Sequence, residues 1–348
     1  MNVETIFLLI KTKMWGISIL TISSILYVSV GLAPLVYGEN RYDGRIGKPF
    51  TDPSYRFPLP DRWRKRSIEY GTEVARSDLV VTLDQHLFPA LLPLINRFAT
   101  RNKLNISVKE GTCGISAGLL KRKVVDMGGF CCTPGRADRL PGLKYHTLGI
   151  AALAVLVHAQ NKIDNITLDQ TRDIFSGKLH YWNEISGLNG SFAWDSPIQV
   201  VGRLHCKARA GHWRLLLDNE DHFSTNMVEV GSIPDMIALV GGNKLAIGFE
   251  VMWMTRLNRS LGSVKPLTID GHSPLSEEDL VAHNYPFYRV YNITTWEDSH
   301  IRKKEADELA EFLISEIDQV DRKFGFLSAE KLRKAGWRFK ENELIGEP

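Results

Sequence analysis

The chain has 348 residues, of which 44% are hydrophobic and 24% are charged, the balance of an ordinary globular protein with one large or two medium domains. This composition excludes the disordered and low-complexity classes. The 43 Lys and Arg residues against 40 Asp and Glu residues leave a net charge of +3, which is too small to favour nucleic acid or an anionic membrane as a partner. Four cysteines are too few for a disulfide scaffold, so they need a local explanation.

The first 38 residues are predicted to direct export. No charged residue lies between Lys13 and Glu39, and the stretch is apolar. It fits either a secretory signal that ends near Gly38 or an uncleaved membrane anchor, because it reaches the roughly 20 residues that span a bilayer. In both cases the segment engages the membrane at least during export. The body of the protein is therefore predicted to be periplasmic or otherwise extracytoplasmic.

Residues 39–77 are rich in Pro, Arg, Tyr and Gly and show neither helical nor strand periodicity, which predicts an extended arm. From Asp78 onward, strand and helix patterns alternate, as in an α/β protein. In chain order we expect a strand at 79–82, a helix from 89, a strand at 105–108, a turn at 111–114, a helix at 116–123, a doubly covered strand at 149–157, a helix capped by Thr167 and Gln170, a strand at 198–201, a helix at 233–240, a strand at 244–249 and a long helix at 304–317.

Several of these segments carry a resemblance to a known family. The apolar run 143–157 is followed by a helix that ends in Ile-Phe-Ser-Gly-Lys178, then by the pair Trp182-Asn183, and later by a strand that delivers Arg203. Together with residues 247–249, 264–271 and 285–289, these segments resemble the phosphate-binding proteins of ABC phosphate uptake systems. The resemblance covers about residues 78–325.

The resemblance implies the type II periplasmic binding-protein fold, with two α/β lobes and a ligand cleft between them. Lobe one would comprise residues 78–157 plus 257–348, and lobe two residues 158–256. Ligands of α/β sheets bind at the loops beyond the strand ends. Four such loops are expected to face the cleft, and all four cysteines fall in them: 83–88, 110–116, 129–136 and 202–211.

These loops also depart from the family pattern. Cys113 stands where the family has a phosphate-binding serine, and Cys131-Cys132 replaces a serine in the third loop. Arg203 matches the family's phosphate-clamping arginine, but the hydroxyl-bearing residues that follow it are replaced by Lys207 and Arg209. The candidate ligand-binding residues are Asp84, Gln85, His86, Thr112, Cys113, Gly114, Cys131, Cys132, Arg136, Arg203, Lys207 and Arg209.

Three interpretations of the cleft stay open. The first is a site for phosphate or a related small anion, held by charge-assisted hydrogen bonds. The second is a soft-metal or thiophilic-ligand site for Cu or Zn, with no other cofactor expected; its ligands would come from Cys113, Cys131, Cys132, His205 and Cys206. The third is oxidation of the cysteines to disulfides, which across the cleft would oppose hinge closure and suit an interaction protein better than a transport receptor.

No catalytic triad order and no phosphate-binding Walker loop occur in the sequence, so we predict that the protein is not an enzyme. The resemblance implies a small anionic ligand as one partner. It also implies an ABC permease, or another membrane or periplasmic protein, as a second. Nucleic acid is not expected.

Overall fold

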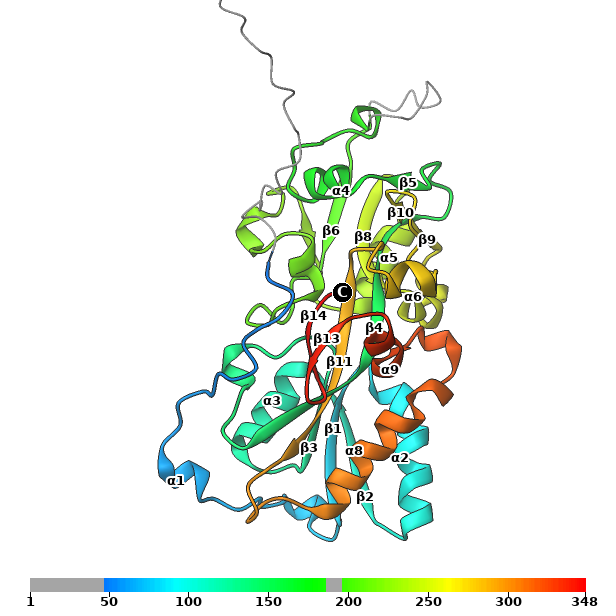
Figure 1. Cartoon of the computed structure of the whole chain (residues 1–348). Helices are drawn as coiled ribbons and strands as arrows, with labels where there is room; N and C mark the ends of the chain where they lie inside the picture. Colours follow the sequence, from blue (N-terminus) through cyan, green and yellow to red (C-terminus); the bar gives the residue numbers. More distant parts are fainter. Residues whose placement is uncertain (1–46, 186–195) are drawn as a thin grey trace, which may run out of the picture. The chain divides into compact units, whose positions relative to one another are not determined.

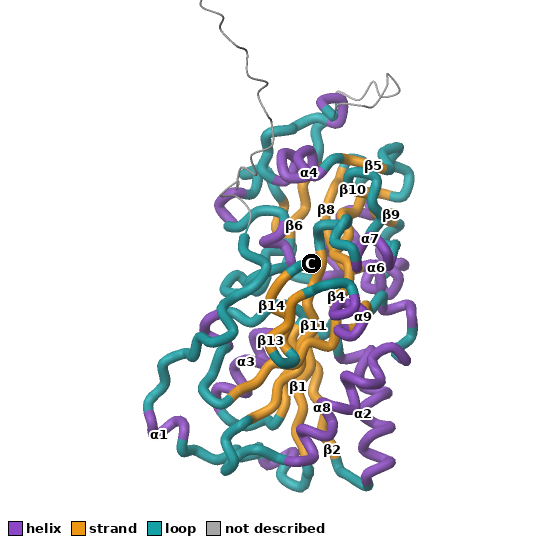
Figure 2. Tube along the Cα trace, in the orientation of Figure 1, coloured by secondary structure: helices purple, strands orange, loops and turns teal. Residues whose placement is uncertain are grey.

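The structure, a computed structural model, describes residues 47–185 and 196–348. The predicted export segment, residues 1–38, lies outside the described residues. Within the described ranges, no helix is both long enough and apolar enough to cross a membrane. Figures 1 and 2 show a twisted sheet with helices packed on its faces.

The central sheet has ten strands in the described part of the chain, with the order β2-β1-β3-β11-β4-β8-β6-β7, while β9 and β12 also pair with β4. Two further pairs, β5 with β10 and β13 with β14, form separate small sheets. The strands are β1 Leu79–Asp84, β2 Ile106–Gly111, β3 Met127–Phe130, β4 Leu143–His158, β5 Asn165–Ile166, β6 Gln199–Gly202, β7 Val228–Glu229, β8 Ala246–Val251, β9 Val264–Pro266, β10 Thr268–Ile269, β11 Tyr288–Trp296, β12 Leu327–Ser328, β13 Arg338–Lys340 and β14 Glu343–Gly346.

Two long strands join the halves of the sheet. The first ten residues of β4, 143–152, pair with β11, and residues 153–157 pair with β8. Strand β4 is buried along nearly its whole length, as expected for an Ala- and Val-rich strand that is covered on both faces. On one side lie the parallel strands β1, β2 and β3, and on the other the parallel strands β6 and β8. We call these halves the first and second lobes, and this arrangement confirms the predicted two-lobed α/β fold.

Helices cover both lobes (Figure 1). Helix α3 packs on β1 and β3, α2 packs on β2, and α8 packs on α2 and β11, whereas α5 packs on β8 in the second lobe. The helices are α1 Asp61–Arg64, α2 Phe88–Asn102, α3 Cys113–Arg122, α4 Leu168–Phe175, α5 Ile233–Gly242, α6 Met252–Leu257, α7 Glu277–Val281, α8 Lys304–Glu316 and α9 Ala329–Lys334.

Local signals in the sequence explain several boundaries. The capping box predicted from Thr167 and Gln170 is present at the start of α4. Helix α3 begins at Cys113, three residues earlier than the predicted start at residue 116, because the Thr112 hydroxyl accepts a hydrogen bond from the Ile115 N–H and caps the helix there. The cysteine is thereby placed in the first turn of a helix and not in a turn before it.

The lobe boundaries predicted from the resemblance stay a prediction. Leu267 and Ile269, which that scheme assigns to lobe one, lie in one hydrophobic cluster with Phe175 and Trp182 of the second lobe. Residues after 256 therefore contribute to the packing of both lobes.

The described part of the predicted arm, residues 47–77, contains the short helix α1 and is otherwise mostly irregular. It packs against the first lobe, since Trp63 lies in the same hydrophobic cluster as β1. The Lys123 ammonium donates hydrogen bonds to the carbonyls of Arg64 and Arg66 and lies 4.5 Å from the centre of the Trp63 ring.

Residues 47–51, here called the strap, connect loops of both lobes. The Gly47 N–H donates to the Arg214 carbonyl at 3.0 Å in the second lobe. At its other end, Thr51 Oγ1 donates to the Pro134 carbonyl at 2.7 Å in the first lobe and accepts from the Arg139 side chain at 2.8 Å. The strap therefore runs directly over the loop that follows β3.

We expect Thr51→Val to lower the free energy of unfolding by about 1–3 kcal/mol, because it removes a hydrogen bond from a buried guanidinium together with the bond to Pro134. Urea unfolding followed by circular dichroism measures the change. Thr72→Val, at an exposed threonine of the same arm, is the control and is expected to stay within about 0.5 kcal/mol of the parent. Equal effects of the two substitutions would contradict the anchoring role of Thr51.

Candidate functional site

The candidate site lies where the parallel strands of the first lobe end. Asp84 is the last residue of β1, Cys113 follows β2, and Cys131 follows β3. Because the carboxyl ends of neighbouring parallel strands lie at one edge of a sheet, these side chains come together. All three are buried.

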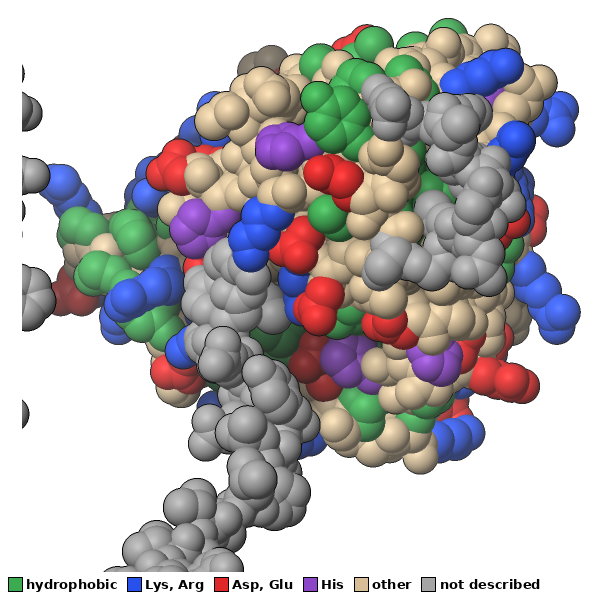
Figure 3. All heavy atoms as spheres, turned by 90° about the horizontal axis from the view of Figure 1, so that it is seen from above, with side chains coloured by type: hydrophobic (Ala, Val, Ile, Leu, Met, Phe, Trp, Pro, Cys, Tyr) green, Lys and Arg blue, Asp and Glu red, His purple; other side chains and the backbone are tan. Residues whose placement is uncertain are grey.

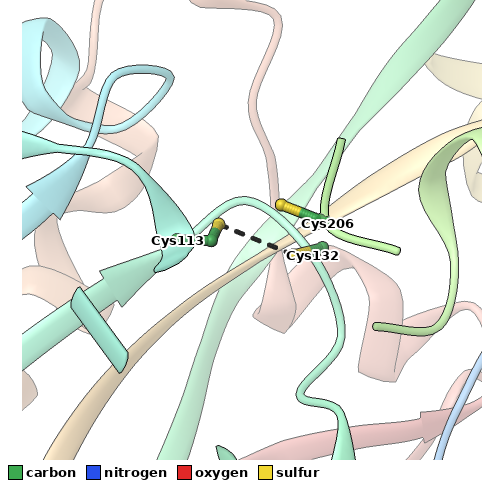
Figure 4. A group of neighbouring side chains, drawn as sticks. All are labelled: Cys113, Cys132 and Cys206. Carbon is green, nitrogen blue, oxygen red and sulfur yellow. Dashed lines mark hydrogen bonds between the residues drawn. The ribbon is translucent and has the colours of Figure 1, made fainter. Parts of the chain in front are cut away.

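The four cysteines converge, as predicted. Cys113 Sγ lies 3.4 Å from Cys131 Sγ and 3.5 Å from Cys132 Sγ. Cys206, from the loop after β6 in the second lobe, completes a group with Cys113 and Cys132 in which all the sulfur atoms lie within 4.8 Å of one another (Figure 4). All four are free thiols, and both of these sulfur–sulfur separations exceed the roughly 2.05 Å of a disulfide bond. The predicted disulfide is therefore absent from this structure.

A buried ion network lies beside the thiols. His86 Nδ1 lies 2.8 Å from Asp84 Oδ1, and His86 Nε2 lies 3.3 Å from Glu250 Oε1. The other oxygen of Glu250 accepts a hydrogen bond from Arg203 Nη2 at 3.0 Å. Since Glu250 belongs to β8 and Arg203 follows β6, the network joins the second lobe to His86 of the first.

The charges of this network support one another. Burial by itself would raise the pKa of Glu250, but the guanidinium groups of Arg203 and Arg289 hold that pKa well below its ordinary value. Burial by itself would lower the pKa of His86, yet Cys131 and Asp84 raise it well above its ordinary value. At neutral pH these shifts favour the ionised form of Glu250 and the protonated form of His86.

Arg289 occupies the centre of the site. It lies within β11 and is fully buried, with Nη1 3.6 Å from Cys131 Sγ and 3.3 Å from His205 Nε2. Its Nη2 is 3.8 Å from Glu250 Oε1, an ion pair that is too long for a hydrogen bond. Among the described residues, neither Nε nor Nη2 of Arg289 has a hydrogen-bond partner, and the same is true of Arg203 Nε and the Tyr291 hydroxyl.

Arg209 makes a second connection between the lobes. Its Nη2 donates to the Cys113 carbonyl at 3.2 Å and to Asp138 Oδ1 at 2.7 Å, and both partners belong to the first lobe. The side chain is largely buried, and its guanidinium lies 5.7 Å from the centre of the Phe130 ring. Arg209 is therefore part of the packed site and not part of a solvated basic face.

His205, which the sequence indicates as a metal ligand, uses both ring nitrogens elsewhere. Nδ1 lies 3.0 Å from the Arg203 carbonyl, and Nε2 faces Arg289, so the proton is assigned to Nδ1. The ring also stacks on His212 at 5.6 Å between centroids. His205 therefore stands beside the thiol groups without joining them.

Some predicted ligand residues lie outside the buried cluster. Lys207 is exposed and pairs with Glu220 at 3.6 Å, and Arg136 is exposed with its guanidinium 4.4 Å from the centre of the Tyr55 ring. The remaining residues that the structure leaves outside the cluster are Gln85, Thr112 and Gly114, which are half-buried or exposed. On the face shown in Figure 3, the drawn basic and acidic side chains are intermingled.

The sequence interpretation missed Glu250, Arg289 and Asp138. Glu250 and Arg289 are the only charged residues of their strands, and a charge within a buried strand is a signal because charged residues are rarely buried without a partner. Only Arg289 falls within a segment that carries the family resemblance. Asp138 carries no comparable signal, because it lies in a single short 3-10 turn, Arg136–Asp138, between β3 and β4.

A cavity of about 710 Å³ lies next to this site, between α6 and residues 317–327. Its lining includes Val251 and Trp253, which follow Glu250 directly, but none of the thiols or site arginines.

Comparisons with known proteins agree with this architecture. The family model of the PBP superfamily domain matches residues 70–316. Among solved structures, the chain is similar to a candidate phosphate ABC transporter substrate-binding protein from Clostridium perfringens with bound phosphate, with 17% identity, a TM-score of 0.58 and coverage of 72% of this chain and 99% of that one. It is also similar to an ABC-type phosphate transport receptor from Vibrio cholerae, with 18% identity, a TM-score of 0.53 and coverage of 76% and 100%. At these identities the likeness shows the fold.

We expect Glu250→Gln to destabilise the protein by about 3–5 kcal/mol at neutral pH, because it leaves the buried Arg203 guanidinium without its counter-charge. The folded-state pKa of Glu250 lies below its ordinary value of 4.5, so its ionised form stabilises the fold above that pH. This contribution falls as the pH drops below 4.5 toward the folded-state pKa. The difference between parent and variant should therefore shrink in acid.

Urea unfolding at neutral pH and in acid measures both effects. Glu278→Gln, at an exposed glutamate of α7, is the matched control and should change stability by no more than about 0.5 kcal/mol. A variant as stable as the parent at neutral pH would show that the network contributes nothing to folding.

Proposed function

Because this chain belongs to the PBP superfamily, we propose that it is an extracytoplasmic solute-binding protein that binds a small oxyanion between its two lobes. We propose, as the sequence predicts, that the protein acts as a receptor and not as an enzyme. It rests on the site and on the fold shared with the two phosphate-binding proteins described above.

The observation that carries the proposal is the set of buried donors around Arg289. Buried polar groups are almost always hydrogen-bonded, so an unpaired donor in the interior calls for an unseen partner such as an ion or water. Here Arg289 offers Nε and Nη2, and Arg203 offers Nε. Both guanidiniums share the single carboxylate of Glu250, which leaves positive charge and N–H donors for an incoming anion.

An oxyanion matches these donors better than a neutral solute, because guanidinium groups bind planar or tetrahedral oxyanions through charge-assisted hydrogen bonds. The ligand is phosphate or a related anion such as sulfate or arsenate. Glu250 competes with it for the same guanidiniums, and Cys113 replaces the family's serine hydroxyl. We therefore propose that the affinities for these anions are ordered differently from those of a phosphate receptor.

We propose that this receptor lies outside the cytoplasm and has an ABC permease as its partner; the predicted export segment and the family support both proposals. The segment itself, residues 1–38, lies outside the described residues, and whether it is cleaved or retained as an anchor stays a prediction.

Isothermal titration with phosphate, sulfate and arsenate tests the proposal. We expect saturable 1:1 binding of at least one anion by the parent and a loss of about 10- to 150-fold in Arg289→Met, since a hydrogen bond to a charged group contributes roughly 1.5–3 kcal/mol. Arg259→Met, at an exposed arginine, is the control and should bind like the parent.

A second readout covers the case in which Arg289→Met does not fold. In Glu250→Gln the guanidiniums have lost their internal carboxylate, so the bound anion should raise the melting temperature of that variant more than that of the parent. A folded parent that binds none of the three anions, together with an unshifted Glu250→Gln variant, would overturn the proposed function.

A further inference from the structure

We propose that Cys113, Cys132 and Cys206 form a binding site for one soft d10 metal ion, Cu(I) in preference to Zn(II), which links the two lobes. This site adds a second ligand to the proposed oxyanion receptor, and the inference does not rest on that function. It is carried by the positions of the sulfur atoms.

The geometry of the three sulfurs suits a single ion. Metal–sulfur bonds of roughly 2.3 Å in a trigonal plane separate the sulfurs by roughly 4 Å. The sulfurs of Cys113 and Cys132 are 3.5 Å apart, and all three sulfur atoms lie within 4.8 Å of one another. Figure 4 shows the three side chains directing their sulfurs toward one another from separate segments of the chain. A small displacement of each side chain is enough to place an ion among them.

The two adjacent cysteines divide between two groups. Neighbouring side chains of an extended stretch point to opposite sides. Accordingly, Cys132 groups with Cys113 and Cys206, whereas Cys131 groups with Cys113 and Asp84 and faces Arg289. Cys131 therefore lies on the side of the ion network, and Cys132 on the side of the second lobe. The metal site consequently has three thiolates rather than four.

A three-thiolate set favours Cu(I). Soft thiolate ligands select Cu(I) and Zn(II) among the common metals, but structural Zn(II) takes four ligands in a tetrahedron. Neither His205 nor Cys131 belongs to the three-thiol group in the described part of the chain. Cu(I) needs no fourth ligand in a trigonal plane, and the buried positions of Cys113 and Cys132 limit the access of water as a fourth ligand.

The surroundings compensate the charge. Each cysteine loses its proton to solvent when it binds the ion, so three thiolates and one Cu(I) carry a net charge of −2. Arg209 hydrogen-bonds to the Cys113 carbonyl beside the site, and Arg289 lies behind it against Cys131. These two buried guanidiniums balance the charge of the complex.

Anaerobic titration of Cu(I) into the reduced, metal-free protein, in competition with a chromophoric Cu(I) chelator and without added oxyanion, tests the site. We expect one Cu(I) per chain, bound more tightly than Zn(II). Cys206→Ser should weaken Cu(I) binding by about 100-fold or more, beyond the range typical of outer-shell partners. Cys206 is the variant of choice because its side chain is only partly buried.

Cys131→Ser is the matched control, because it removes a buried thiol that touches Cys113 without belonging to the three-thiol group. Its loss of affinity should be at least about tenfold smaller than that of Cys206→Ser, since it is not a ligand. Circular dichroism checks that both metal-free variants are folded. X-ray absorption of the copper-loaded parent should show three sulfur ligands.

Three outcomes would overturn the inference: no stoichiometric Cu(I), equal losses in the two variants, or a copper shell dominated by nitrogen or oxygen. The two proposals fail separately. Cys206→Ser should keep oxyanion binding, and Arg289→Met, which removes a neighbouring charge but no ligand, should weaken Cu(I) binding at least about tenfold less than Cys206→Ser does, so the loss of one ligand leaves the test of the other intact.

Discussion

The carboxylate of Glu250 is the interaction on which the site depends. An ionised carboxylate in a dry interior is tolerated only with close counter-charges, because the cost of removing it from water is several kcal/mol. Glu250 obtains them from Arg203 in its own lobe and from His86 in the other. His86 is in turn oriented by Asp84, whose second oxygen accepts a hydrogen bond from the Cys113 N–H. One buried charge thus fixes the position of the lobes and of the helix that carries the central thiol.

This internal pairing separates the protein from a plain anion receptor. The guanidiniums of this site already have a carboxylate partner, so negative charge alone does not select an anion. The selectivity between anions then depends on their hydrogen bonds with the unpaired donors, above all those of Arg289. The thiols, which can bind a soft metal ion, lie a few ångströms away. Cys131 lies between the two sites, since it contacts both Arg289 and Cys113. A hard oxyanion and a soft cation would therefore occupy neighbouring positions, and the negatively charged Cu(I)–thiolate complex and the oxyanion would share the positive charge of Arg289.

The convergence of Cys113 and the Cys131-Cys132 pair was predictable from topology, because loops after neighbouring parallel strands lie at one edge of a sheet. The approach of Cys206 from the second lobe was expected from the family resemblance. The partners of the charges were not predictable in this way. Glu250 and Arg289 lie inside buried strands, and their pairing depends on which strands are neighbours across the lobes. Periodicity also gave no reason to distinguish Lys207 from Arg209, although one is exposed and the other is buried against Asp138. Side-chain direction in an irregular loop is set by tertiary contacts that a single sequence does not contain.

The strap gives the molecule a kinetic property. It is bonded to Arg214 on one side and to Thr133 and Pro134 on the other, directly after the paired cysteines. If the protein works as the proposed receptor, its lobes would separate to release the ligand only after the strap had detached from one of them. The residence time of the bound ligand would then depend on how fast residues 47–51 detach. A protein that binds these residues would control the release of the ligand.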